Sequence, residues 1–275
     1  MAPGPAHHLA AVRSGLAAVI ALRVATGPYT QLAGQPAALF RPPALLSWLA
    51  SMPPFGVLVA LQVVGTAAAV AAAAGRRPSS TLAVAWGSLL VLAGLRGSLG
   101  KVLHNDVLLL LAAVPVLFAP ADAAWGDRRT SRRWGWPVRA ATAVIAAVYA
   151  ACGVQKLRHT GVAWVTGDNM RWILWSAVAG TRAPTRAVAR AIAERAWLSH
   201  VVAGTLLGLE LAAPVLLARP RARTTFVALA AALHVGTWLT LGLDYWAWAL
   251  TVAVVALPAE WWDRAARRRP VAPAA

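Results

Sequence analysis

The chain has few charged residues, a single cysteine and almost no lysine. Charged residues make up 13% of its 275 residues and apolar residues 59%. That charged fraction is about half the level typical of soluble domains. A soluble domain of this size would need a polar surface that this composition does not supply. The lone Cys152 excludes an intrachain disulfide, a CxxC redox pair and a multi-cysteine zinc site.

Motifs for nucleotides and metals are also missing. There is no P-loop, no GxGxxG and no GxSxG, and the histidines form neither an HExxH motif nor an i,i+4 pair. We therefore expect no metal site, no nucleotide-driven transport and no α/β-hydrolase chemistry. The net charge of +17 would suggest a nucleic-acid partner in a soluble protein. Here the arginines lie in short runs between apolar segments, so no nucleic-acid partner is expected.

Long apolar segments dominate what is present, and they predict an all-α, polytopic membrane bundle of about eight transmembrane helices. We expect one membrane domain over 1–275, with a core at about 9–260. The expected spans are 9–27, 55–75, 81–99, 103–119, 138–157, 197–217, 223–241 and 244–259.

The arginines predict the orientation of this bundle. With eight spans, 14 of the 24 arginines fall on one side, in short loops or in the basic tail at 261–275. The positive-inside rule makes that side cytoplasmic, together with both termini, in a multi-pass protein of the cell membrane. The connection at 158–196 carries several arginines on the opposite side. Its 183–196 part is expected to form an amphipathic helix in the outer interface.

This orientation collects ionisable residues at the outer leaflet, where they often mark a pocket or a relay. Lys156 and Lys101 are the only lysines, and both fall there. Lys101 is interpreted as an interfacial residue. Lys156 is either a snorkelling side chain or a neutral amine in an apolar cavity, where it could act as a base, which arginine cannot do.

Further polar residues lie at helix starts or within the expected spans, and several have more than one interpretation. His104 and Asn105 open the fourth span, where Asn105 or Asp106 could cap the helix and His104 could carry a proton or bind a ligand. His234 lies within the seventh span as a core histidine or a functional one. Glu210 is the only acid deep in a span, and we expect it to be protonated or paired, with Arg13 or Arg23 as its partner.

The order of these segments resembles the horizontally transferred transmembrane (HTTM) domain, the membrane part of vitamin K-dependent γ-glutamyl carboxylase. The resemblance rests on ALRVATGP, LHNDVLLLLA, YAACGVQKLRHTGVAW, LLGLELAAPVLL and LHVGTWLTLGLDYWAWALTVAVVALP, and it covers roughly 10–260. It implies that Lys156 is a base acting on a vitamin K-like hydroquinone. It further implies that His104, Asn105 and His234 belong to the same catalytic site.

The sequence departs from that family at several positions. The order His104–Asn105 is reversed, and Arg158, His159 and Gly161 stand where the carboxylase has acids. The 275 residues contain no counterpart of the large lumenal domain, so carboxylation of a propeptide-bearing protein is not expected. We expect an outer-leaflet polar pocket for a quinol-like or lipid-like molecule. The alternative is a non-enzymatic maturation or immunity partner that binds a peptide, or a small-ligand transporter.

Overall fold

A computed structural model describes residues 3–99, 104–180 and 185–262. The chain is all-α, with one two-residue antiparallel ladder between β1 (Gly4–Pro5) and β2 (Thr130–Ser131). Its contacts define two compact units. Unit 1 comprises residues 1–141 and 259–275, and unit 2 comprises residues 142–258. Helix α5 (Arg132–Thr160) begins in unit 1 and ends in unit 2.

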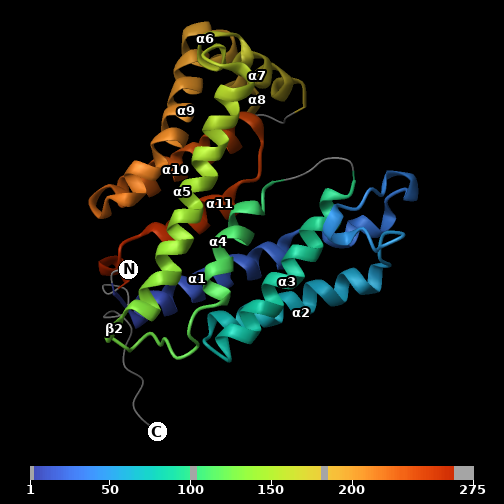
Figure 1. Ribbon diagram of the computed structural model, residues 1–275. Helices are drawn as coiled ribbons and strands as arrows, with labels where there is room; N and C mark the ends of the chain where they lie inside the picture. Colours follow the sequence, from blue (N-terminus) through green and yellow to red (C-terminus); the bar gives the residue numbers. More distant parts are fainter. Residues whose placement is uncertain (1–2, 100–103, 181–184, 263–275) are drawn as a thin grey trace. The chain divides into compact units, whose positions relative to one another are not determined.

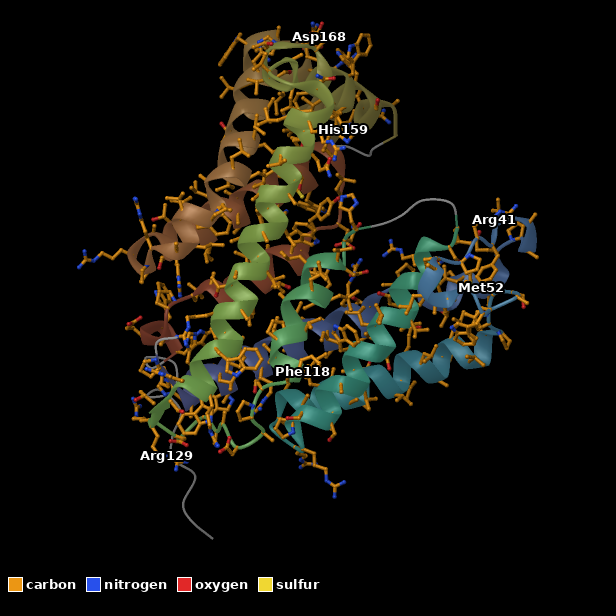
Figure 2. The ribbon with its side chains drawn as sticks, viewed as in Figure 1. Arg41, Met52, Phe118, Arg129, His159 and Asp168 are labelled. Atoms are coloured by element: carbon orange, nitrogen blue, oxygen red, sulfur yellow. The ribbon has the colours of Figure 1, made fainter. Side chains whose placement is uncertain are left out.

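Unit 1 is built on three long helices that pack against one another, α1 with α2 and α3, and α2 with α3 (Figure 1). Its elements before α5 are α1 (Ala6–Thr26), η1 (Tyr29–Gly34), η2 (Ala37–Leu39), η3 (Ala44–Leu46), α2 (Phe55–Ala73), α3 (Pro78–Gly97) and α4 (Val107–Leu117). In Figure 2, Arg41 and Met52 lie toward one end of this unit, and Phe118 and Arg129 lie away from it.

The start of α1 is held by the loop that precedes α5. The backbone N–H groups of Ala6 and His7 donate to the carbonyls of Arg129 and Asp127, at 3.0 and 2.9 Å. These bonds satisfy donors that a helix N-terminus otherwise leaves without partners. The side chain of Arg129 also donates to the Asp127 carboxylate and lowers the pKa of that carboxyl. The loop therefore anchors the first helix mainly through its backbone.

The described part of unit 2 contains the second part of α5 and six further helices. They are α6 (Ala163–Thr166), α7 (Asn169–Gly180), α8 (Thr185–Ala193), α9 (Ala196–Ala218), α10 (Pro220–Leu241) and α11 (Trp246–Ala256). Helices α6, α7 and α8 gather where α5 ends and α9 begins, the end at which His159 and Asp168 lie (Figures 1 and 2). Met170, Leu174, Ala189 and Ala193 form the buried core of that end.

Among the described residues, six helical segments are long and apolar enough to cross a membrane, and they indicate a multi-pass membrane protein. They are Ala6–Gly34, Phe55–Ala73, Pro78–Gly97, Arg132–Thr160, Ala196–Ala218 and Pro220–Leu241. The expected spans at 103–119 and 244–259 form the shorter helices α4 and α11, with 11 residues each. At 1.5 Å per residue these helices are about 16 Å long, roughly half the thickness of a hydrocarbon core.

Large apolar side chains cover the outside of these helices. Val63, Val70, Trp197 and Trp238 are each more than half exposed. Buried polar side chains, including Arg13, Arg23, Asp106 and Glu210, lie inside the two units. Exposed apolar surface of this extent marks a membrane or protein interaction site, and it agrees with the six apolar helices.

The amphipathic segment expected at 183–196 contains α8. This helix buries Ala189 and Ala193 and exposes Arg186 and Arg190. Residues 183–184, Lys101 and positions 263–275 of the predicted basic tail lie outside the described residues.

Candidate functional site

The most unusual group in unit 2 is an ion pair between Lys156 of α5 and Glu210 of α9. The Lys156 ammonium donates to both carboxylate oxygens of Glu210, at 2.6 and 2.8 Å. The Glu210 side chain is 10% exposed and that of Lys156 is 21% exposed. The Lys156 Nζ also lies 5.4 Å from the ring centroid of Trp164, within cation–π range. A charged pair at this depth between apolar helices is costly unless its groups have partners, and here two hydrogen bonds join the two residues.

The expected partner of Glu210 was wrong. Arg23 pairs with Asp106, with both side chains less than 5% exposed. Arg13 instead donates to the backbone carbonyls of Pro120 and Ala123, at 3.0 and 2.8 Å. Both arginines therefore have their partners within unit 1, and Glu210 pairs with the lysine of α5.

Gly153 allows α5 and α9 to approach each other at this pair. A Cβ at position 153 would lie 2.9 Å from Leu211 Cδ2 and 3.2 Å from Glu210 Cβ. The first atom ends a flexible side chain, but the second is attached directly to the α9 backbone. A larger residue at 153 would therefore push α9 outward and lengthen the bonds from Lys156 to Glu210.

Gly153→Ala is expected to destabilise the protein by about 1 to 2 kcal/mol, the cost typical of adding a methyl group to a close-packed contact. The matched control is Gly208→Ala on α9, where an added Cβ meets no atom within 4 Å. Thermal unfolding of both variants in detergent measures the difference. Equal midpoints for the two variants would show that the close approach at Gly153 does not hold the pair in place.

A second polar contact joins α5 to α10 through Tyr149 and His234. The Tyr149 hydroxyl lies 2.8 Å from His234 Nε2, in a hydrogen bond whose direction depends on the histidine tautomer. The imidazole is 9% exposed, and its Nδ1 has no hydrogen-bond partner among the described residues. The ring centroids of Tyr245 and Trp248 lie 5.8 and 5.9 Å from the ring centroid of His234. His234 is thus buried in a cluster of aromatic rings, and Tyr149 is its polar partner there.

The two polar contacts begin on one face of α5. Tyr149, Cys152, Gly153 and Lys156 are spaced i, i+3, i+4 and i+7, which places them on the same side of a helix. Cys152 is half-buried on this face. Sequence reasoning missed Tyr149, although its spacing from Lys156 in YAACGVQK was a signal that could have revealed it.

The structure places the four predicted site residues in different units. Lys156 and His234 belong to unit 2, whereas His104 and Asn105 belong to unit 1. Asn105 is buried and His104 is exposed. Asp106 is the N-cap residue of α4, but its carboxylate bonds to Arg23 and makes no capping bond. The shared pocket of all four residues stays a prediction.

A separate cavity of about 590 Å³ lies between α7, α8, α9 and α10, entirely within unit 2. Its lining is apolar except for the hydroxyls of Thr205, Thr237 and Thr240. None of the four predicted site residues lines it. Glu210 also does not, because the cavity borders Leu209 and Ala212 of α9 while Glu210 faces α5.

No group of three or more metal-ligating side chains occurs among residues 3–99, 104–180 and 185–262. Comparison with known proteins adds no assignment, since no family model, curated protein or solved structure matches the chain. The HTTM resemblance therefore continues as a proposal that rests on the sequence pattern and on the chemistry of the site.

Proposed function

We propose that the chain is an HTTM-type integral membrane protein in which Lys156 and Glu210 form a proton-accepting pair. The pair would act on the hydroxyl group of a quinol-like or lipid-like molecule. The supporting observation is the two-bond contact between these residues, 2.6 and 2.8 Å long, among apolar helices. Ionisable residues at such positions usually serve transport or catalysis, because they cost stability there.

The pair accepts a proton at Lys156 when Glu210 holds the shared one. An ammonium with a carboxylate and an amine with a carboxylic acid contain the same number of protons. In the second form the Lys156 amine takes up one more proton when a bound hydroxyl group gives one up, and the pair then carries one positive charge. That charge would lie beside the new oxyanion and stabilise it.

The geometry leaves Lys156 able to contact a ligand. An ammonium has three N–H donors, and the described contacts with Glu210 use two of them. The partial exposure of the side chain gives access to the third donor. One polar group in an otherwise apolar surrounding fits an amphipathic molecule such as a quinol, which when bound would supply an acidic hydroxyl group and reducing electrons.

The proposed setting is the cell membrane, crossed by about eight helices with both termini cytoplasmic. The support is the distribution of arginine, with 14 of 24 on one side of such a bundle. Lys156 then lies toward the outer leaflet. Cysteine-accessibility labelling of single-cysteine variants should find positions in 121–136 reachable only from the cytoplasmic side, and an outside location would overturn this orientation.

The function is tested by Lys156→Arg, since arginine keeps the positive charge but does not release its proton. Solvent extracts of the purified protein would first identify any bound quinone. Ionisation of the bound quinol, followed by its ultraviolet absorbance, is expected to slow by about 10²-fold or more, the usual contribution of a general base. Lys101→Arg, at the chain's other lysine, is the control and should behave as the wild type.

Two outcomes would contradict the proposal. One is an unchanged rate in Lys156→Arg. The other is a peptide or protein, without any quinone or lipid-like molecule, in the purified material. Both outcomes together would favour the alternative of a non-enzymatic maturation or immunity partner.

A further inference from the structure

The segment 35–54, which joins η1 to α2 in unit 1, is exposed and apolar at the same time. Arg41 is its only charged residue. Leu39, Leu45 and Trp48 are 50%, 59% and 74% exposed. A loop in water usually presents polar side chains, and several large apolar ones on a short surface segment mark contact with a membrane or a protein. The segment therefore needs a partner surface.

The opposite side of this segment packs on the last turn of α3. Leu46 is 2% exposed, and a Cβ at Gly94 would lie 2.9 Å from Leu46 Cδ1. The backbone N–H of Arg41, which marks this end of unit 1 in Figure 2, donates to the Ser98 carbonyl at 2.7 Å. Helix α3 has 20 residues and is about 30 Å long, the thickness of a hydrocarbon core. Its last turn therefore holds the segment at the boundary between hydrocarbon and head groups.

Residues 43–49 form a turn, the 43–49 turn, that bonds backbone groups within itself. The N–H groups of Leu46 and Leu49 donate to the carbonyls of Pro43 and Leu46, at 2.8 and 2.9 Å. The Ser47 hydroxyl donates to the carbonyl of Ala44 at 2.9 Å. Pro43 has no N–H to satisfy. Internal bonds of this kind lower the cost of placing irregular backbone where water is scarce.

Exposed apolar side chains continue along the chain from the 43–49 turn into α2. Phe55 and Val57, in the first turn of α2, are 60% and 45% exposed, and Val63 is 61% exposed. Helix α2 is long and apolar enough to cross a membrane, so these side chains suit contact with acyl chains. Trp48 suits the edge of the hydrocarbon, because an indole ring is largely apolar and has one N–H donor.

We propose that the 43–49 turn inserts into the bilayer beside the end of α3, with the Leu45 and Trp48 side chains among the first carbons of the acyl chains. The partner is the lipid surface itself, and no charged head group is required because the turn carries no charge. Insertion holds α2 and α3 at a fixed depth, since interfacial tryptophans anchor spanning helices.

This membrane contact goes beyond the proton-accepting role proposed for Lys156 and Glu210. It concerns unit 1 alone, whereas that pair belongs to unit 2. A failure of one proposal therefore leaves the other standing.

The test attaches a nitroxide spin label to single-cysteine variants, made in the Cys152→Ala chain and reconstituted in phosphatidylcholine vesicles. Power-saturation measurements compare collisions with oxygen, which concentrates among acyl chains, and with a water-soluble nickel chelate. The logarithm of the oxygen-to-nickel collision ratio should be positive for Leu45→Cys and Trp48→Cys, as for the exposed Val63→Cys of α2. It should be negative for Ala124→Cys, an exposed loop position that serves as the control.

A second measurement identifies lipid as the contact. A nitrobenzoxadiazole fluorophore on Trp48→Cys should lose more fluorescence than the same fluorophore on Ala124→Cys when part of the phosphatidylcholine carries a nitroxide near the start of its acyl chains. Trp48 and Ala124 are both exposed, so neither substitution opens a cavity in the core.

Two results would overturn the proposal. One is a collision ratio at Leu45 and Trp48 no higher than that at Ala124, which would place the 43–49 turn in water. The other is protection of both labels from oxygen and nickel without quenching by the lipid nitroxide. That result would place the turn against another protein chain, such as a second copy.

Discussion

Glu210→Leu is expected to lower the free energy of unfolding by about 3 kcal/mol, since it leaves the Lys156 ammonium among apolar helices without its partner. Lys156→Met should have a similar cost through the unpaired carboxylate. Both losses of stability should be larger than the loss expected for an exposed ion pair, because the Glu210 side chain is only 10% exposed. Thermal unfolding in one detergent at one protein concentration measures both variants.

The double variant Lys156→Met/Glu210→Leu separates the pair from its surroundings. Two apolar residues of similar size remove both charges, so most of the lost stability should return. The coupling free energy from this double-mutant cycle is expected to be strongly favourable. Additive losses in the double variant would show that the two side chains do not interact in the folded protein. The same variant should have no activity on a quinol, which separates a structural role from a functional one.

The second large effect is expected in unit 1, at the pair formed by Arg23 and Asp106. Asp106→Asn keeps the size of the side chain but leaves a buried guanidinium without its counter-charge. A loss of about 3 kcal/mol follows, because both side chains are less than 5% exposed. The midpoint of thermal unfolding should fall clearly.

Asp127→Asn provides the matched control for that variant, within the same unit. Asp127 also pairs with an arginine, but the Arg129 side chain is 75% exposed and the contact is screened by solvent. This variant should leave the midpoint unchanged. If Asp106→Asn behaves like Asp127→Asn, the pair between α1 and the start of α4 does not stabilise the fold.

The amino-acid sequence by itself determined the helices and their setting. Long apolar runs separated by prolines, glycines and arginine clusters form helices because backbone groups must be satisfied internally wherever water is absent. Six of the eight expected spans therefore appear as helices of sufficient length. The segments at 103–119 and 244–259 are as apolar, but each folds into a helix of 11 residues. Hydropathy reports apolar character and does not report where a helix ends.

Only the tertiary structure decided which polar groups meet. The sequence showed that Glu210 needs a partner, yet the choice among Arg13, Arg23 and Lys156 depends on the rotation and packing of whole helices. The close approach of α5 and α9 at Gly153 brings Lys156 to Glu210 across 54 residues of chain. The contact of Tyr149 with His234 spans 85 residues in the same way. The local sequence shows that burying each polar group is costly. The partner of that group is determined by contacts between segments far apart in the chain.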